Sequence, residues 1–138
     1  GETRTMTSLA TLPGFLIHFA SALVLLALAT WAFDKLTPTD QMRMIREGNT
    51  ACAVSMGGVV IGFALGVGAA FRYSANLLDA AVWGVVALLA QLIAFYVVVR
   101  LMGPSWREDF ERGAMAPAVF KASVAVAVGW INSAAMAT

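Results

Sequence analysis

The chain has 138 residues, of which 60% are hydrophobic and only 12% are charged, and its formal net charge is +1. A soluble domain of this size needs more polar surface, because about a quarter of the residues in an average domain are charged. The composition therefore excludes a soluble globular domain, and the absence of a basic stripe interleaved with aromatic residues argues against nucleic acid as a partner.

Four apolar spans divide the sequence, at residues 12–33, 51–71, 77–102 and 115–137. Each has the ~20 residues that a helix needs to cross the ~30 Å hydrocarbon core of a bilayer. A helix is expected in every case, because a segment in lipid must satisfy its own backbone polar groups. The sequence thus predicts an all-α integral membrane protein with four transmembrane helices, preceded by a short N-terminal segment of residues 1–11.

The first span follows Arg4 and contains Ala27-Leu28-Ala29, a pattern that also resembles the cleavage site of a signal peptide. We expect the span to be retained, because its apolar run is longer than a signal core and continues beyond that tripeptide.

A charged loop of residues 34–50 comes next. Asn49 is predicted to cap the second span, since its side chain can accept a hydrogen bond from an N–H group of the first helical turn.

Small residues recur every four positions on the second and fourth spans, which places each set on one helical face. The two sets are Gly58, Gly62, Gly66 and Ala70, and then Ala125, Gly129, Ser133 and Ala137. Without bulky side chains, two helix backbones can approach closely. The faces are either a seam between copies of the chain or, as we favour, the packing surface within one four-helix monomer.

Each polar side chain within the spans has a structural and a functional interpretation. Gln91, near the middle of the third span, and Asn132, toward the end of the fourth, either join helices by hydrogen bonds or line a pore. Lys121, about six residues into the fourth span, either snorkels toward the headgroups or contacts an ion or a counter-charge. Asp79 begins the third span and is favoured there by the helix dipole.

His18 lies in the first span, where it can titrate, act as a ligand or simply form a hydrogen bond. No metal site is expected, because no Cys, second His or carboxylate stands at ligand spacing from it. The sequence also has no nucleophile–base pair and no phosphate-binding glycine loop. We therefore expect no catalytic residue and no cofactor, and the chain is not predicted to be an enzyme.

The two halves of the chain share one layout, with an offset of 65 residues. "IREGNTACAV" (45–54) is followed by "FERGAMAPAV" (110–119), and each passes from charges through Gly48 or Gly113 into small apolar residues. At this offset 11 of 59 aligned pairs are identical, which is weak evidence by itself in so alanine-rich a chain. The shared order of long span, six-charge loop, glycine and small-residue span is stronger. It predicts two tandem helical hairpins, residues 12–73 and 77–138, as parallel repeats.

The distribution of lysine and arginine along the chain predicts its orientation in the membrane. The loops 34–50 and 100–114 carry three basic residues each, whereas the other side has only Arg4 and Arg72. The positive-inside rule places both loops in the cytoplasm and both termini outside.

The stretches "KLTPTDQMRMIREGNTACAV", "LLDAAVWGVVALLAQLIAF" and "AVFKASVAVAVGWINSAAMAT" together resemble the YjfL-like family, domain of unknown function 350. The resemblance covers about residues 34–138, and the first span agrees only in hydropathy. It implies a bacterial inner-membrane protein with two repeats that associates with itself or with partners, and it supplies no catalytic residue. The chain departs from the family at residues 114–117, where Asn-Thr-Ala-Ala is usual, and at Lys121, where the family has an apolar or small residue.

These observations predict a structural or accessory membrane protein that self-assembles or packs against a larger membrane complex. The alternative is an oligomeric channel or transporter for small ions or amines, with Gln91, Asn132 and Lys121 along its path. Four helices enclose little space, so a pore would need several copies. The two hypotheses differ in whether the polar residues face a shared axis or lie within each monomer.

Overall fold

The computed structural model describes residues 10–36, 41–102 and 112–137, and every regular element in these ranges is a helix. The long helices are α2 (Leu12–Leu36), α4 (Thr50–Tyr73), α5 (Leu77–Met102) and α7 (Met115–Ala135). All four are long and apolar enough to cross a membrane. The predicted all-α class with four membrane-spanning helices is confirmed, and the helix bounds lie within three residues of those expected.

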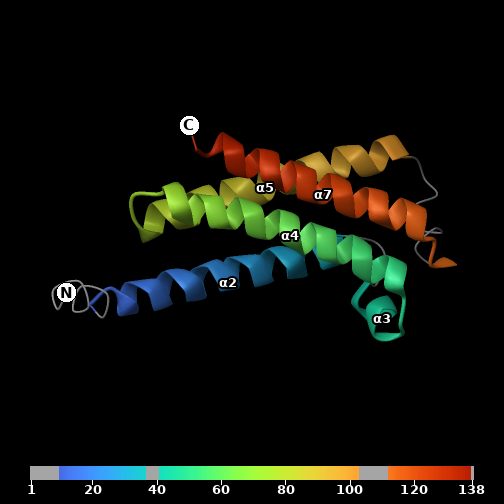
Figure 1. Ribbon diagram of the computed structural model, residues 1–138, viewed down its shortest axis with the longest axis horizontal. Helices are drawn as coiled ribbons and strands as arrows, with labels where there is room; N and C mark the ends of the chain where they lie inside the picture. Colours follow the sequence, from blue (N-terminus) through green and yellow to red (C-terminus); the bar gives the residue numbers. More distant parts are fainter. Residues whose placement is uncertain (1–9, 37–40, 103–111, 138) are drawn as a thin grey trace, which may run out of the picture.

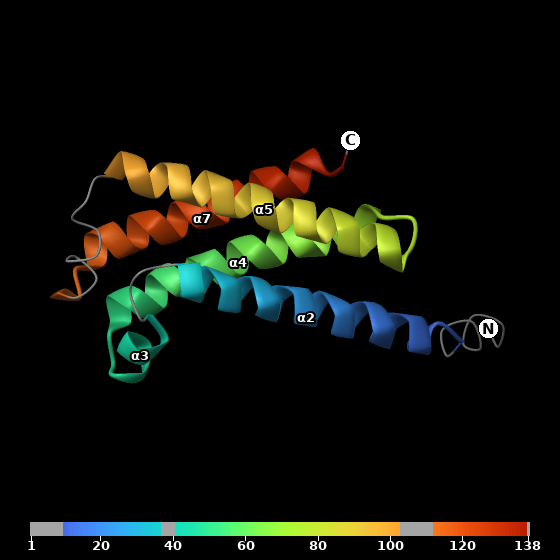
Figure 2. The same cartoon turned by 180° about the vertical axis from the view of Figure 1, so that it is seen from behind.

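The four long helices run side by side, with α4 at the centre (Figure 1). Helix α4 contacts α2, α5 and α7 and packs most extensively on α7. Helix α5 contacts both α4 and α7, whereas α2 packs on α4 and α5, away from α7 (Figure 2). Only 6% of the apolar window of α2 is buried, against 56% for α4. Most of α2 therefore faces away from the rest of the bundle.

Both charged segments lie at one end of this bundle. Helices α2 and α5 end there, and α4 and α7 begin there, so α4 and α7 are parallel to each other (Figure 1). We call this the basic end, because it carries Lys35, Arg43, Arg46, Arg100 and Arg112. The far end is the opposite one, where α4 finishes and α5 begins.

The membrane sidedness of these ends is a prediction that cysteine labelling tests. A cysteine introduced at Ala75, at the far end, is expected to react only from outside the cell. Cysteines at Thr39 and Ser105, which lie outside the described residues, should react only from the cytoplasm. Native Cys52 is fully buried and adds little background. Labelling of Thr39 and Ser105 positions from opposite faces would contradict the two-hairpin topology.

The helix starts follow the 65-residue offset. Leu77 lies 65 residues after Leu12, and Met115 lies 65 residues after Thr50. Gly48 and Gly113 each precede a helix start by two residues and have φ values of +93° and +74°. Glycine adopts this left-handed region without the steric cost that a Cβ brings. The residues directly before α4 and α7 thus turn in the same way, each through a glycine of positive φ.

The beginning of α4 has a polar cap that the beginning of α7 lacks. The side-chain oxygen of Asn49 accepts a hydrogen bond of 3.0 Å from the backbone N–H of Cys52. Ala114, the counterpart of Asn49 in the second half, forms no side-chain cap. One missing cap costs a helix about 1 kcal/mol, so α7 depends more on its packing against α4.

The short helix α3 (Gln41–Arg46) was not predicted, because its six residues show no clear hydrophobic period. It places Met44 against Ala51, Cys52 and Ala118, where α4 and α7 begin. Its outer face carries Arg43, whose Nε lies 3.8 Å from Oε1 of Glu47 in an exposed i,i+4 pair. Such a pair contributes only a few tenths of a kcal/mol. Packing of α3 against α4, rather than this pair, therefore holds the segment on the bundle.

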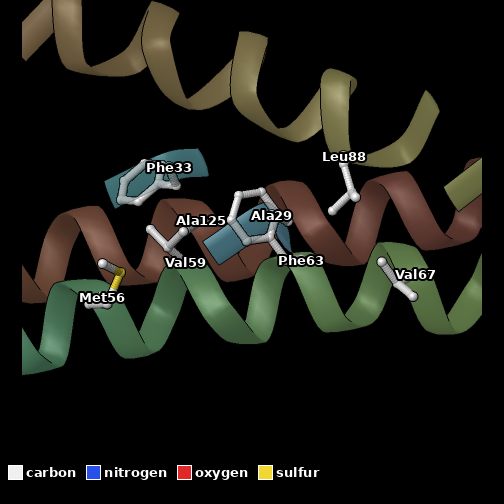
Figure 3. Packing of buried hydrophobic residues seen from close by; sticks show 8 residues of the cluster. All are labelled: Ala29, Phe33, Met56, Val59, Phe63, Val67, Leu88 and Ala125. Carbon is white, nitrogen blue, oxygen red and sulfur yellow. The ribbon is translucent and has the colours of Figure 1, made fainter. Parts of the chain in front are cut away.

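The core lies between α4 and the three helices around it, as Figure 3 shows. The Phe33 ring on α2 packs edge-on against Phe63 of α4 and Phe95 of α5, with centroid separations of 6.2 and 5.2 Å. This aromatic trio joins three helices at one point. The buried residues of the cluster are Ala29, Phe33, Met56, Val59, Phe63, Val67, Leu88 and Ala125.

Candidate functional site: a small-residue seam with buried polar groups

Helices α4 and α7 approach so closely at their crossing that their backbones nearly touch. A Cβ atom built at Gly58 would lie 2.4 Å from Cα of Ala122, and one at Gly62 would lie 2.5 Å from the Ala125 carbonyl oxygen. A Cβ at Gly129 would lie 2.6 Å from Cα of Gly62. Only glycine fits at these three positions. The small-residue faces identified in the sequence therefore meet each other within one chain. We call this contact between α4 and α7, at Gly58, Gly62 and Gly129, the seam.

Other members of the two small-residue sets have different positions. Gly66 faces α5 and α7, because a Cβ there would lie 3.2 Å from the Asn132 amide nitrogen and 3.3 Å from the Ala87 Cβ. Ala70 is buried near the far end of α4. Ser133 is only half-buried and lines a hollow on the outer surface of α4 and α7, so it lies outside the seam.

Gln91 of α5 reaches the α4–α7 crossing at the level of Gly62 and Ala125. Its amide nitrogen donates a hydrogen bond of 2.9 Å to the carbonyl oxygen of Ala125, and the side chain is 1% exposed. The same nitrogen would lie 2.6 Å from a Cβ built at Gly62, so the absence of a side chain at Gly62 makes room for the amide. Among the described residues the side-chain oxygen of Gln91 has no hydrogen-bond partner.

Asn132 of α7 makes the reciprocal contact, one level closer to the far end. Its amide nitrogen donates a hydrogen bond of 2.9 Å to the carbonyl oxygen of Ala87 on α5. The α5 side chain thus binds the α7 backbone, and the α7 side chain binds the α5 backbone. Each interhelical bond of this kind contributes about 0.6–2 kcal/mol. Together they fix the register between α5 and α7.

Lys121 lies inside the bundle, so the interpretation of this residue as a snorkelling lysine is wrong. Its side chain is 1% exposed, on the face of α7 that also carries the buried Ala118 and Ala125. This face packs against α4, because Ala118 lies against Ala51 and Cys52, and Ala125 lies against Gly62. At the repeat offset its counterpart is Met56, which is also buried. A charged residue inside a membrane bundle is expensive and marks a position with a specific role.

Further buried polar groups at the basic end were missed by the sequence analysis. They are Asp34 on α2, Gln41 on α3, and Cys52 and Ser55 on α4. The Cys52 thiol donates to the backbone oxygen of Gln41 at 3.6 Å. One side-chain oxygen of Asp34 and that of Gln41 are buried without a hydrogen-bond partner among the described residues. Gln41 could not be singled out, because its burial depends on α3, which was not predicted.

His18 lies away from the seam, on the exposed surface of α2. Its Nδ1 is 2.8 Å from the Gly14 carbonyl oxygen, so the tautomer protonated there donates within its own helix. Its ring packs edge-on to Phe71, with centroids 6.1 Å apart. Within the described ranges no group of three His, Cys, Asp or Glu side chains is placed to hold a metal ion. The contacts of His18 are therefore those of helix packing.

Comparison with known proteins finds similarity over nearly the whole chain. The family model of Domain of Unknown Function (DUF350) matches residues 6–136. The UPF0719 inner membrane protein YjfL of Escherichia coli strain K12 is 28% identical over 131 residues, which cover 95% of this chain and 98% of that protein. The protein of the same name from E. coli O157:H7 has the same identity and coverage. No solved structure matches the chain significantly. The chain therefore belongs to the family described as Domain of Unknown Function (DUF350).

Proposed function

We propose that the chain is a non-enzymatic structural or accessory protein of the bacterial inner membrane, which self-assembles or packs against a larger membrane complex. Four apolar helices and an inner-membrane relative support the location. The observation that carries the proposal is the position of Gln91, Asn132 and Lys121. In a pore made of several copies, such side chains would face a shared axis.

Gln91 and Asn132 instead bind backbone carbonyl groups inside the monomer, across the contact between α5 and α7. Both amides are therefore used to hold helices together. The α4–α7 crossing is closed at the level of Gln91, because the backbones of Gly62 and Gly129 nearly touch there. This packing favours a rigid scaffold over a conduit through one monomer.

The outer surface has features that suit a partner helix. A shallow groove of about 790 Å³ runs between α4 and α7 on their outward side. Its floor includes Gly57, at which an added Cβ would meet nothing within 4 Å. Small residues of this kind allow another transmembrane helix to approach closely. Bulky side chains such as Phe15, Phe19 and Trp31 are exposed along α2. These two surfaces are the proposed contacts of the assembly.

Two measurements test the proposal against the alternative of an ion channel. Mass measurement of the gently extracted native assembly is expected to show several copies or a second protein. Liposomes that contain the purified chain are expected to show no ion flux above empty liposomes. A lone monomer in the first measurement would contradict the accessory role.

Two variants make the flux measurement specific. Gln91→Leu should lower stability by only about 1 kcal/mol, because it loses the bond to Ala125 but also removes a buried oxygen without a described partner. Lys121→Met, which copies the buried Met56 of the first half, should leave the assembly intact. Robust wild-type flux that changes in Lys121→Met would overturn the proposed role in favour of a channel.

A further inference from the structure

A hollow of about 340 Å³ opens at the far end of the bundle, between the end of α4, the start of α5 and the end of α7. Its volume lies within the range of about 300–1,000 Å³ that is typical of small-ligand sites. The polar and aromatic side chains at its wall are Tyr73, Ser74, Asp79, Trp83 and Asn132. The hollow is thus unlike the apolar groove between α4 and α7.

Asp79 gives the hollow a negative charge. One carboxylate oxygen of Asp79 accepts a hydrogen bond of 3.1 Å from the backbone N–H of Ala75. The backbone N–H of Asp79 donates a hydrogen bond of 2.9 Å to the side-chain oxygen of Asn76. The bond from Ala75 holds the half-buried carboxylate, and the bond to Asn76 holds its backbone at the start of α5. Among the described residues no lysine or arginine forms a salt bridge with it. Arg72 lines a different hollow, which shares Tyr73 with this one.

Two aromatic residues line the same hollow as this carboxylate. Tyr73 is 52% exposed and Trp83 is 49% exposed, so about half of each residue is left uncovered by the rest of the protein. The faces of such rings attract cations, and Trp attracts them most strongly. The amide nitrogen of Asn132 is already bonded to Ala87, which leaves its side-chain oxygen as an acceptor. A fixed negative charge, two aromatic faces and an acceptor oxygen match the chemistry of an ammonium group.

We propose that this hollow binds an organic ammonium group, of a free small amine or of an ethanolamine lipid headgroup at that membrane face. A metal ion fits less well, because the hollow offers one carboxylate, whereas hard cations take several oxygen ligands. The inference is independent of the proposed accessory role. It concerns a site on the surface of one monomer, whatever that monomer assembles with.

The test uses the purified full chain in nanodiscs of phosphatidylglycerol, which has no ammonium group. Tetramethylammonium and ethylammonium chloride are titrated at constant ionic strength, with binding followed by calorimetry. Saturable binding is expected for the wild type. Asp79→Asn keeps an oxygen for the Ala75 N–H but removes the charge, and it should weaken binding by on the order of tenfold. Trp83→Leu should weaken it about threefold or more, whereas Trp83→Phe should retain part of the affinity.

Trp130→Leu is the matched control, because Trp130 is an exposed indole of α7 outside this hollow. It should bind both amines as the wild type does. Thermal unfolding of each variant shows separately that the bundle is intact, and the exposed position of Trp83 keeps that variant folded. No saturable binding by the wild type, or binding that Asp79→Asn leaves unchanged, would overturn the proposal.

Nanodiscs that also contain phosphatidylethanolamine distinguish the two sources of ammonium. If the lipid headgroup occupies the hollow, the free amines should bind several-fold more weakly in these discs. Phosphatidylethanolamine should then be retained in native mass spectra of the wild type and lost from Asp79→Asn. If a free amine is the ligand, its affinity should be equal in both kinds of disc. Either result supports an ammonium site, and each identifies a different source.

Discussion

Gly62→Leu is expected to force α4 and α7 apart and to lower the stability of the bundle by at least about 3 kcal/mol. Even a Cβ at this position would lie 2.5 Å from a backbone oxygen of Ala125, which cannot move aside as a flexible side chain would. Overpacking of a well-packed core commonly costs about 1–3 kcal/mol, and here backbone must shift as well. The displaced α7 would also break the bond between Gln91 and Ala125. Thermal unfolding of the detergent-solubilised protein measures the loss.

Gly57→Leu is the matched control, since it adds the same side chain to the same helix. Nothing lies within 4 Å of a Cβ at Gly57, so the variant should be as stable as the wild type or more so. Because Gly57 lines the outer groove, this variant also reports on assembly. A lower copy number with unchanged stability would identify the groove as the contact surface. Equal stability of Gly62→Leu and the wild type would show that the α4–α7 crossing is not as close as described.

Phe33→Ala is expected to detach α2 from the rest of the bundle. Helix α2 buries little of its surface, and Phe33 is the residue through which it meets both Phe63 and Phe95. Loss of a buried phenylalanine side chain costs about 3–5 kcal/mol in soluble cores, much of it lost dispersion contacts, which lipid does not fully replace. The remaining three helices keep their seam. Spin labels on α2 and α4 would show a longer and broader distance distribution in the variant.

Phe15→Ala provides the comparison for Phe33→Ala. The Phe15 side chain is 60% exposed and stacks only on Phe19 of the same helix, with centroids 5.6 Å apart. Its removal should leave the distances between α2 and α4 unchanged. If both variants behave alike, α2 is held by its whole length rather than by the aromatic trio.

Local features of the sequence were sufficient to predict the four long helices and several of their ends. A span in lipid must bond its own backbone, so length and apolarity alone define the four long helices. The turn at Gly48 and the cap at Asn49 are equally local, because a positive φ and an orphan N–H each select a residue type. The 65-residue offset between the helix starts could be read from the order of charges, glycine and small residues.

The tertiary structure decided which helix faces meet. It placed the glycine faces of α4 and α7 against each other, paired Gln91 with Ala125, buried Lys121 and added α3 to the basic end. In a soluble protein, the apolar stripe of a helix points to the core. In lipid the outward face is as apolar as the inward one, so the sequence has no such stripe from which to read the rotation of each helix. Only close packing of shapes, which involves residues far apart in the chain, selects the partners of Gly62, Gln91 and Lys121.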